Sequence, residues 1–201
     1  MDVVLILVAA IAVWQVLRAR YQRGHIVLLG SHLAGLKIEQ HMETLTQGYT
    51  RAIHEASESR QLQVLETYAQ TERIMASQIQ ALANGLNKAG APAASMGVLP
   101  FCVPHIETVL PRLARDFREL LRIHAIGIRR VVDNDQGWDA KSRAFHLSAE
   151  LYLFQHSCHW FCKSRLVADA RLVARHQVTH QKVLESVSDA TREAYQRWLQ
   201  G

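Results

Sequence analysis

Residues 139–200 contain neither proline nor glycine, and this uninterrupted run constrains the fold more than any other feature of the chain. Proline and glycine are the residues that most often interrupt helices and strands. At about 1.5 Å per residue, a single helix through the whole run would be about 90 Å long. The upstream segments are therefore expected to pack against this rod or to tie it to a membrane, which predicts an all-α protein.

The composition is that of a folded protein without a strong charge signature. The chain has 201 residues, enough for one core, with 49% apolar and 20% charged residues and a formal charge of +5. No basic cluster interleaved with aromatics is present, which argues against nucleic acid as a partner. Binding of acidic lipid or nucleic acid through the arginines stays open as an alternative that predicts strong salt dependence. Three cysteines are too few for a disulfide framework and fit a reducing compartment.

The N-terminus reads as a membrane anchor. Residues 3–17 are almost entirely apolar, and Arg18, Arg20 and Arg23 follow at once. Positive charge after the apolar run places the rest of the chain in the cytoplasm. Residues 1–23 are therefore predicted to be the transmembrane anchor of a single-pass protein in the inner (cytoplasmic) membrane. A buried core helix or an uncleaved signal-like segment is the alternative.

The anchor is expected to join the body through a flexible segment. Residues 24–36 are apolar but interrupted by three glycines, which favours a juxtamembrane joint over a second crossing. Residues 37–201 then form the cytoplasmic body, an elongated helical bundle or coiled coil of three or four helices.

The first body helix is predicted from a repeat of apolar residues every three to four positions that begins after Lys37. The repeat loses phase at residues 57–60 and resumes in a new frame. Because no glycine or proline marks a break there, we expect one long helix with a shifted packing seam. Its end is placed at Gly85 or Gly90, either of which can terminate a helix.

A proline-rich loop, residues 88–107, precedes the second helix. This helix is expected to begin at Thr108 as N-cap and to end near Val132. Residues 133–138 then form a short hairpin turn, and Asp139 caps the final helix.

Folding the hairpin back on itself pairs positions whose numbers sum to about 271, which places His124 beside His146. The final helix then overshoots the second helix by about half its length. An apolar seam without a partner in the chain argues for oligomerisation.

Three possible ligands lie within one helical turn at Cys158, His159 and Cys162. With a fourth ligand from a neighbouring element, they suit zinc or haem iron. His124 and His146, facing each other across the hairpin, could add to such a site. The alternative is structural: Cys158 falls on the core seam, where a free cysteine behaves as a small apolar residue, and a buried histidine pair makes the packing pH-sensitive.

Familiar catalytic motifs are missing from the sequence. His176 and His180 have the spacing of a zincin helix but lack the glutamate beside the first histidine, and there is no phosphate-binding loop or nucleophile elbow. The chain is therefore predicted to be a non-enzymatic, membrane-tethered scaffold or adaptor. The alternative is a metal- or haem-binding membrane sensor.

Partners are expected to be membrane lipid at the N-terminal helix and either another protein or a second copy of the chain. Aromatic side chains on an exposed helix face would anchor such a contact. Trp160 and Trp198 could equally serve to close the bundle. The predicted interaction residues are Tyr152, His156, His159, Trp160, Tyr195 and Trp198.

Overall fold

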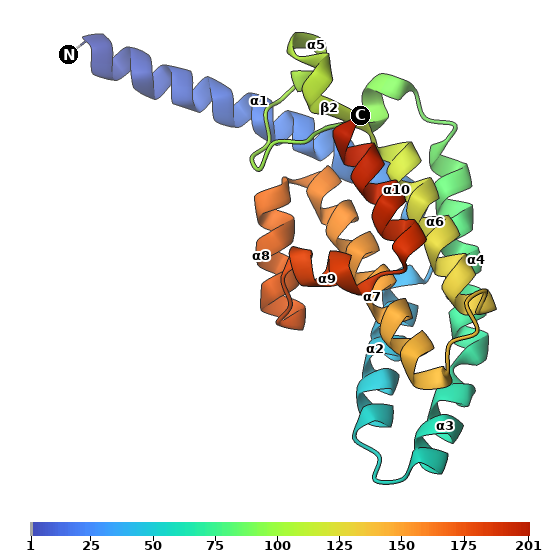
Figure 1. The fold of residues 1–201 in the computed structure, drawn as a ribbon. Helices are drawn as coiled ribbons and strands as arrows, with labels where there is room; N and C mark the ends of the chain where they lie inside the picture. The colour runs from blue at the N-terminus through green and yellow to red at the C-terminus, as the bar shows by residue number, and fades with distance from the viewer. Residues whose placement is uncertain (1) are drawn as a thin grey trace.

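The computed structural model describes residues 2–201, with side chains from Val3 onward, and these residues form ten α-helices and one two-stranded ribbon (Figure 1). Helices account for 79% of the chain, so the all-α class is confirmed. The expectation of three or four long helices in the body is wrong. Nine shorter helices follow the N-terminal one, because capping side chains interrupt the runs that lack proline and glycine.

Helix α1 runs without interruption over Asp2–Leu33. It includes most of the predicted joint at residues 24–36, and Gly24 and Gly30 lie inside the helix with open space around them. The chain leaves helical geometry only at Ala34–Lys37, where Gly35 has a positive φ of 87°. Leu29 in the second half of α1 is 3% exposed, so packing on the body holds the glycine-containing part helical.

The predicted long helix from Lys37 is divided into α2 (Ile38–Ile53), α3 (Glu58–Thr67) and α4 (Ala69–Leu86). The break falls where the apolar repeat loses phase. Ser57 accepts a hydrogen bond from the backbone N–H of Arg60 and so begins α3. A bend at Tyr68 then separates α3 from α4. The α2–α3 pair forms an arm at the end of the molecule remote from the N-terminus (Figure 1).

The connection after α4 is longer and more structured than the predicted loop at residues 88–107. It holds the 3-10 helices η1 (Ala91–Ala94) and η2 (Pro111–Leu113), helix α5 (Ile106–Val109), and strands β1 (Ser95–Gly97) and β2 (Ala114–Asp116). The strands are antiparallel, with Met96 opposite Arg115.

Helix α6 (Phe117–Asp133) begins nine residues later than Thr108. Its N-cap is Asp116, which accepts a hydrogen bond from Arg118 N at 2.8 Å. Pro111 lies outside the helix and starts η2 instead.

The hairpin between α6 and α7 (Ala140–Cys162) has the predicted turn and cap. Asn134 ends α6 with a positive φ of 59°, and Asp139 Oδ1 accepts hydrogen bonds from the N–H groups of Lys141 and Ser142. The predicted register is wrong, because His124 lies beside Ser157, not His146. The observed pair sums to 281 instead of 271, so the positions of α7 that face α6 lie at higher numbers than predicted.

The 60-residue rod does not exist. After α7 the chain folds back as α8 (Arg165–His176), α9 (His180–Ser186) and α10 (Asp189–Gln200). Each of these helices begins at a hydroxyl N-cap that accepts a backbone N–H three residues ahead; the caps are Ser164, Thr179 and Ser188.

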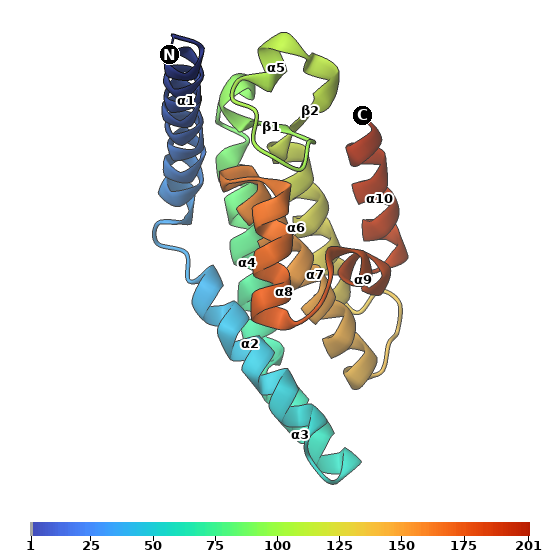
Figure 2. The same cartoon turned by 90° about the vertical axis from the view of Figure 1, so that its left-hand side faces the viewer.

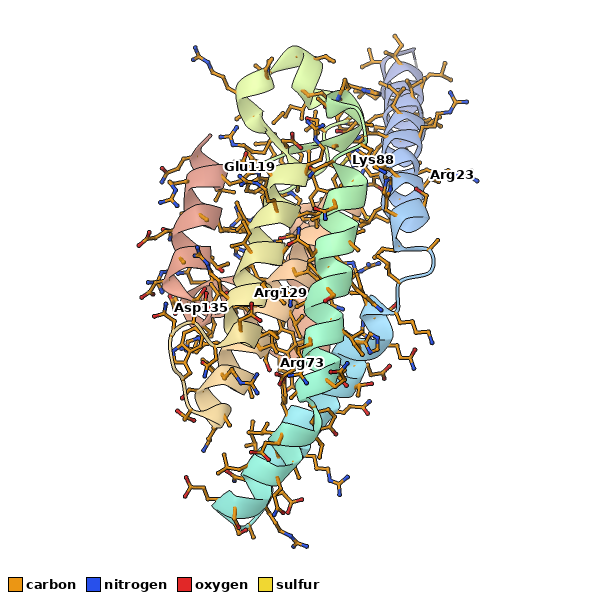
Figure 3. The ribbon with its side chains drawn as sticks, turned by 90° about the vertical axis from the view of Figure 1, so that its right-hand side faces the viewer. Arg23, Arg73, Lys88, Glu119, Arg129 and Asp135 are labelled. Carbon is orange, nitrogen blue, oxygen red and sulfur yellow. The ribbon has the colours of Figure 1, made fainter. Side chains whose placement is uncertain are left out.

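The core lies between α7 and the helices around it. Figures 1 and 2 show α4, α6 and α7 side by side, with α8 and α9 packed on α7 and α10 on α6. Most of the apolar seam that was expected to overshoot is thus covered within the chain, although Leu166 and Val173 of α8 stay 63% and 47% exposed. The sequence argument for oligomerisation is weaker as a result. The outer face of α4 and α6 is polar, and Arg73, Glu119 and Arg129 project from it (Figure 3).

Candidate functional site

Helix α1 is the one helix among the described residues that is long and apolar enough to cross a membrane. Its most apolar 18-residue window has a mean hydropathy of 2.0, and none of that window is buried in the protein. The large apolar side chains between Val3 and Leu17 are all exposed, from 42% for Trp14 to 74% for Leu5. Nothing in the described part of the chain covers this half of the helix.

The second half of α1 is fixed to the body by polar and aromatic contacts. Gln22 Nε2 donates to the carbonyl oxygen of Lys163 at 3.0 Å, and His25 Nδ1 lies 2.8 Å from that of Phe161. The His25 ring stacks on Phe161 with centroids 4.2 Å apart. Tyr21 donates its hydroxyl to Glu107 Oε2 at 3.1 Å. The helix therefore enters the body as a rigid extension of it.

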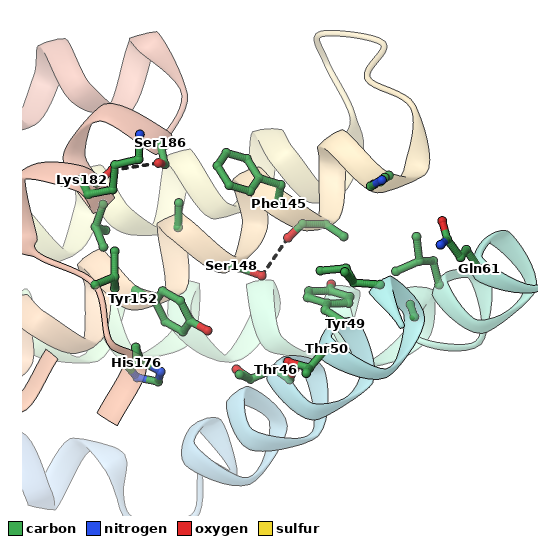
Figure 4. Close-up of a pocket in the computed structure, with 18 residues that line it drawn as sticks. Thr46, Tyr49, Thr50, Gln61, Phe145, Ser148, Tyr152, His176, Lys182 and Ser186 are labelled. Atoms are coloured by element: carbon green, nitrogen blue, oxygen red, sulfur yellow. Dashed lines mark hydrogen bonds between the residues drawn. The ribbon is translucent and has the colours of Figure 1, made fainter. Parts of the chain in front are cut away.

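The groove is a pocket of about 450 Å³ between the α2–α3 arm and helices α7 and α9 (Figure 4). Most of its wall is apolar. Phe145 and Ile53 remain 56% and 61% exposed, which is high for large apolar side chains. The apolar wall residues are Ala52, Ile53, Leu65, Ala144, Phe145, Ala149, Val178 and Val183.

Polar groups are spaced around this apolar wall. Hydroxyl groups come from α2 and α7, and Lys141 and Lys182 lie on the α7 and α9 sides. Tyr152 stacks on His176 with ring centroids 4.0 Å apart. Burial raises the pKa of the Tyr152 hydroxyl and lowers that of the His176 imidazole, so both rings are held neutral. The groove thus offers apolar contact, neutral hydrogen-bonding groups and two cations.

A buried ion pair lies beneath the groove. Glu72 on α4 is 1% exposed; its Oε1 accepts the Tyr49 hydroxyl at 2.6 Å and its Oε2 contacts Arg143 Nη1 at 2.5 Å. These three side chains join α2, α4 and α7. Because Tyr49 also lines the groove, the ion pair fixes the position of the arm relative to α7.

Four of the predicted interaction residues are buried. His156, Trp160, Tyr195 and Trp198 are at most 4% exposed, which contradicts their placement on an open face. Trp160 Nε1 donates to the carbonyl of Gly97 at 3.1 Å, and Trp198 Nε1 donates to that of Asp116 at 2.9 Å.

The two indoles therefore close the core against the ribbon. Trp160 has no open face of α7 to lie on, because α7 packs against α6, α8 and α9.

Tyr152 and His159 are the predicted interaction residues that stay partly exposed. Tyr152 lines the groove. His159 lies in a separate hollow between α7 and α8, where Arg171 Nη1 donates to its Nδ1 at 3.0 Å. Burial and the neighbouring arginines lower the pKa of His159, which matches its role as an acceptor.

The alternative metal site is not assembled. Among residues 2–201, no group of three or more His, Cys, Asp or Glu side chains is arranged to hold a metal ion. His124 lies 2.9 Å from Ser157 Oγ, and His146 stacks on Trp138 instead of facing it. Burial raises the pKa of the Cys158 and Cys162 thiols, so neither is a ready thiolate ligand.

A further polar cluster links α7, α8 and α9 inside the body. His156 Nε2 contacts Asp169 Oδ1 at 2.8 Å, and the His156 and His180 rings lie 4.4 Å apart. His180 Nε2 is 3.1 Å from the Tyr195 hydroxyl. Burial lowers the pKa of His180 to about 4. These contacts hold α8, α9 and α10 on α7, and His156 also lines the hollow between α7 and α8 that contains His159.

Apart from Tyr152, the groove residues are not predicted from the sequence, although one signal points to them. Lys141, Phe145, Ser148 and Tyr152 follow one another at spacings of four, three and four residues, so they share one face of α7. That face mixes cationic, aromatic and hydroxyl groups, whereas the buried side of the same helix is mostly apolar, with Glu150, His156 and Ser157 as its polar members. The opposite wall on α2 and α3 could be located only once the arm was known to fold across it.

The proposal for function rests on the geometry described above. No protein-family model, curated protein or solved structure matches the chain.

Proposed function

We propose that the protein is a non-enzymatic, single-pass membrane adaptor whose cytoplasmic body binds a segment of a partner protein in the groove. The tether is supported by the first half of α1, whose apolar side chains have no cover in the described chain. Arg18, Arg20 and Arg23 follow the apolar run, and this asymmetry favours a cytoplasmic body.

The groove supports binding of a partner segment. Its volume of about 450 Å³ lies in the range of ligand pockets, roughly 300–1,000 Å³, and accommodates a few large side chains. Phe145 and Ile53 offer exposed apolar surface, while Lys141 and Lys182 favour negative charge. The partner segment is therefore expected to carry apolar anchors next to acidic residues.

The proposal is carried by one observation, namely that two apolar surfaces remain uncovered at opposite ends of the molecule. The first half of α1 projects from one end, and the groove lies beside the α2–α3 arm at the other (Figure 1). This arrangement suits a tether that holds a binding site away from the bilayer and raises its local concentration for a partner at the membrane.

Membrane fractionation tests the tether. The full chain, expressed in its native host, is expected to stay in the membrane pellet after carbonate washing and to be released by detergent. Release by carbonate alone would contradict a spanning anchor.

Affinity purification in mild detergent tests the groove. We expect Phe145→Ser combined with Ile53→Ser to remove a co-purifying protein that the wild-type chain retains. Val173→Ser is the matched control, because Val173 is 47% exposed on α8 outside the groove. Lys141→Glu is expected to weaken the same interaction, since it reverses one of the two cations beside the groove.

Three outcomes would contradict this assignment of the groove. The first is an unchanged set of co-purifying proteins in the groove variants. The second is loss of self-association alone, which would make a second copy of the chain the occupant. The third is a tightly bound small amphipathic molecule that leaves with the groove variants, which would make the groove a ligand pocket.

A further inference from the structure

Four exposed apolar side chains lie on the segments that meet α1 where it enters the body, and we call them the loop patch: Phe101, Val109, Leu110 and Leu166. They are 59%, 75%, 52% and 63% exposed. The backbone joins their segments, because Leu166 N donates to the carbonyl of Pro100 at 2.9 Å. None of the described elements covers this patch.

Hydrogen bonds fix the segments that carry the loop patch at the height of Tyr21 and Gln22 along the α1 axis. Tyr21 donates its hydroxyl to Glu107, two residues before Val109, and the His105 ring meets the Tyr21 ring edge-on with centroids 5.0 Å apart. Gln22 donates to the carbonyl of Lys163, three residues before Leu166. Figure 1 shows α5 above the part of α1 that enters the body.

This level corresponds to the headgroup layer of a bilayer that α1 spans. Tyr21 is four residues beyond the end of the apolar run at Leu17, which is about 6 Å along a helix. The headgroup layer on each side of the hydrocarbon core is roughly 5–7 Å thick. A loop bonded to Tyr21 and Gln22 therefore lies within that layer, where exposed apolar side chains can reach the acyl chains.

Positive charge lies on the same segments as the loop patch. Arg18 and Arg20 precede Tyr21 on α1, and Arg112 is exposed in η2, two residues after Leu110. The acidic Glu107 is occupied by Tyr21 and lies 3.5 Å from His105. Apolar side chains flanked by arginines match the surface of an anionic bilayer.

We propose that the loop patch enters the headgroup layer of an anionic bilayer and gives the body a second membrane contact besides α1. This inference rests on the proposed anchor. With two contacts the body has one preferred rotation about the α1 axis, so the groove faces a defined direction above the membrane.

Site-specific photo-crosslinking on the full-length protein in nanodiscs tests this contact. Benzoylphenylalanine replaces one of three residues of similar exposure: Phe101 in the loop patch, Leu7 in α1 (57% exposed) or Phe145 in the groove (56% exposed). The lipid is phosphatidylcholine with phosphatidylglycerol. After irradiation, lipid adducts are measured by mass spectrometry. We expect adducts from Leu7 and Phe101 but not from Phe145.

The three positions separate failure of the contact from failure of the anchor. Adducts from Leu7 but not Phe101 would overturn the loop contact and leave the anchor intact. No adduct from Leu7 would overturn both. Adducts from Phe101 to a protein instead of lipid would make the patch a protein interface and overturn the inference. In phosphatidylcholine alone, the Phe101 adduct is expected to decrease while the Leu7 adduct stays constant; an unchanged Phe101 yield would overturn the requirement for anionic lipid.

Discussion

Two carboxylates are buried among the described residues, and their surroundings differ. Glu72, between α2, α4 and α7, has a partner for each oxygen: Tyr49 for Oε1 and Arg143 for Oε2. Glu150, between α6, α7 and α10, contacts only hydroxyl and backbone groups of its neighbours. Its Oε1 accepts the N–H and hydroxyl of Ser188, and its Oε2 has no hydrogen-bond partner.

The difference means that the stability of one helix contact depends on a cation and that of the other depends on pH. At Glu72 the cation of Arg143 compensates for burial, so the crossing beneath the groove depends on that pair. At Glu150 no cation is available, and burial raises its pKa to about 7. The α6–α7–α10 crossing therefore depends on a proton near neutral pH.

Removing the cation beneath the groove should have the largest effect. Arg143→Ala leaves the Glu72 carboxylate buried without its charge partner, and we expect a loss of about 3–5 kcal/mol in the free energy of unfolding. Denaturant unfolding of the detergent-solubilised chain, followed by circular dichroism, measures this loss. Arg129→Ala is the control, because Arg129 and Asp133 form an exposed pair at 4.0 Å. Equal losses of stability in the two variants would contradict a larger role for the buried ion pair than for the exposed one.

Raising the pH should weaken the other crossing. Between pH 4.5, the ordinary pKa of a glutamate, and about 7, folded Glu150 holds a proton that the unfolded chain has released. The free energy of unfolding therefore falls as pH rises through this window, by about 1.4 kcal/mol per unit and by about 3 kcal/mol in total. Denaturant midpoints measured from pH 4 to pH 8 report this loss.

The Glu150→Gln variant separates this contribution from other titrations. It should flatten the loss between pH 4.5 and 7, because the amide carries no titrating proton. The loss on the acid side should remain. There, burial of His124 lowers its pKa to about 3, so stability is lost as pH falls below 6.5. A Glu150→Gln profile that still declines towards pH 7 would assign the proton to another group.

Gly127 lies close to Glu150, and Gly48 precedes Tyr49, the partner of Glu72. Replacing either glycine by alanine is expected to have the smallest effects on stability. A methyl group on Gly127 would contact the buried side chains of Thr191 and Glu150, and such overpacking costs about 1–3 kcal/mol. A methyl group on Gly48 would contact Tyr68, a half-buried ring on the arm that can swing outwards.

Gly48→Ala should therefore cost less than Gly127→Ala. In both variants a helical alanine recovers up to about 1 kcal/mol relative to glycine. Thermal unfolding of both variants gives the order. The reverse order would mean that the arm packs more rigidly than the α6–α10 crossing.

The sequence predicts the parts of the fold that local chemistry decides. The turn after α6 and the Asp139 cap follow from short-range signals, and the apolar start of α1 follows from hydropathy. The breaks at Ser164, Thr179 and Ser188 could not be predicted in this way. Serine and threonine also occur inside helices, and whether they cap a new helix depends on the tertiary contacts made by folding back.

The candidate site was harder to predict because both of its walls result from such folding. The sequence predicts Tyr152 as a contact residue, and it lines the groove, whereas Trp160 and Trp198 are predicted on the same aromatic character and are buried. Aromatic character alone does not distinguish a contact surface from a core. That distinction needs the positions of α8, α9 and the arm.

The continuity of α1 has a mechanical consequence. A flexible joint would allow the body to sample many orientations around a fixed anchor. With the proposed anchor in place, a helix without a break, bonded at Tyr21, Gln22 and His25, would act instead as a lever that converts tilt and rotation in the bilayer into displacement of the arm. In a membrane whose thickness changes the tilt of α1, the groove would therefore move with the lipid, and its reach towards a partner would follow bilayer thickness.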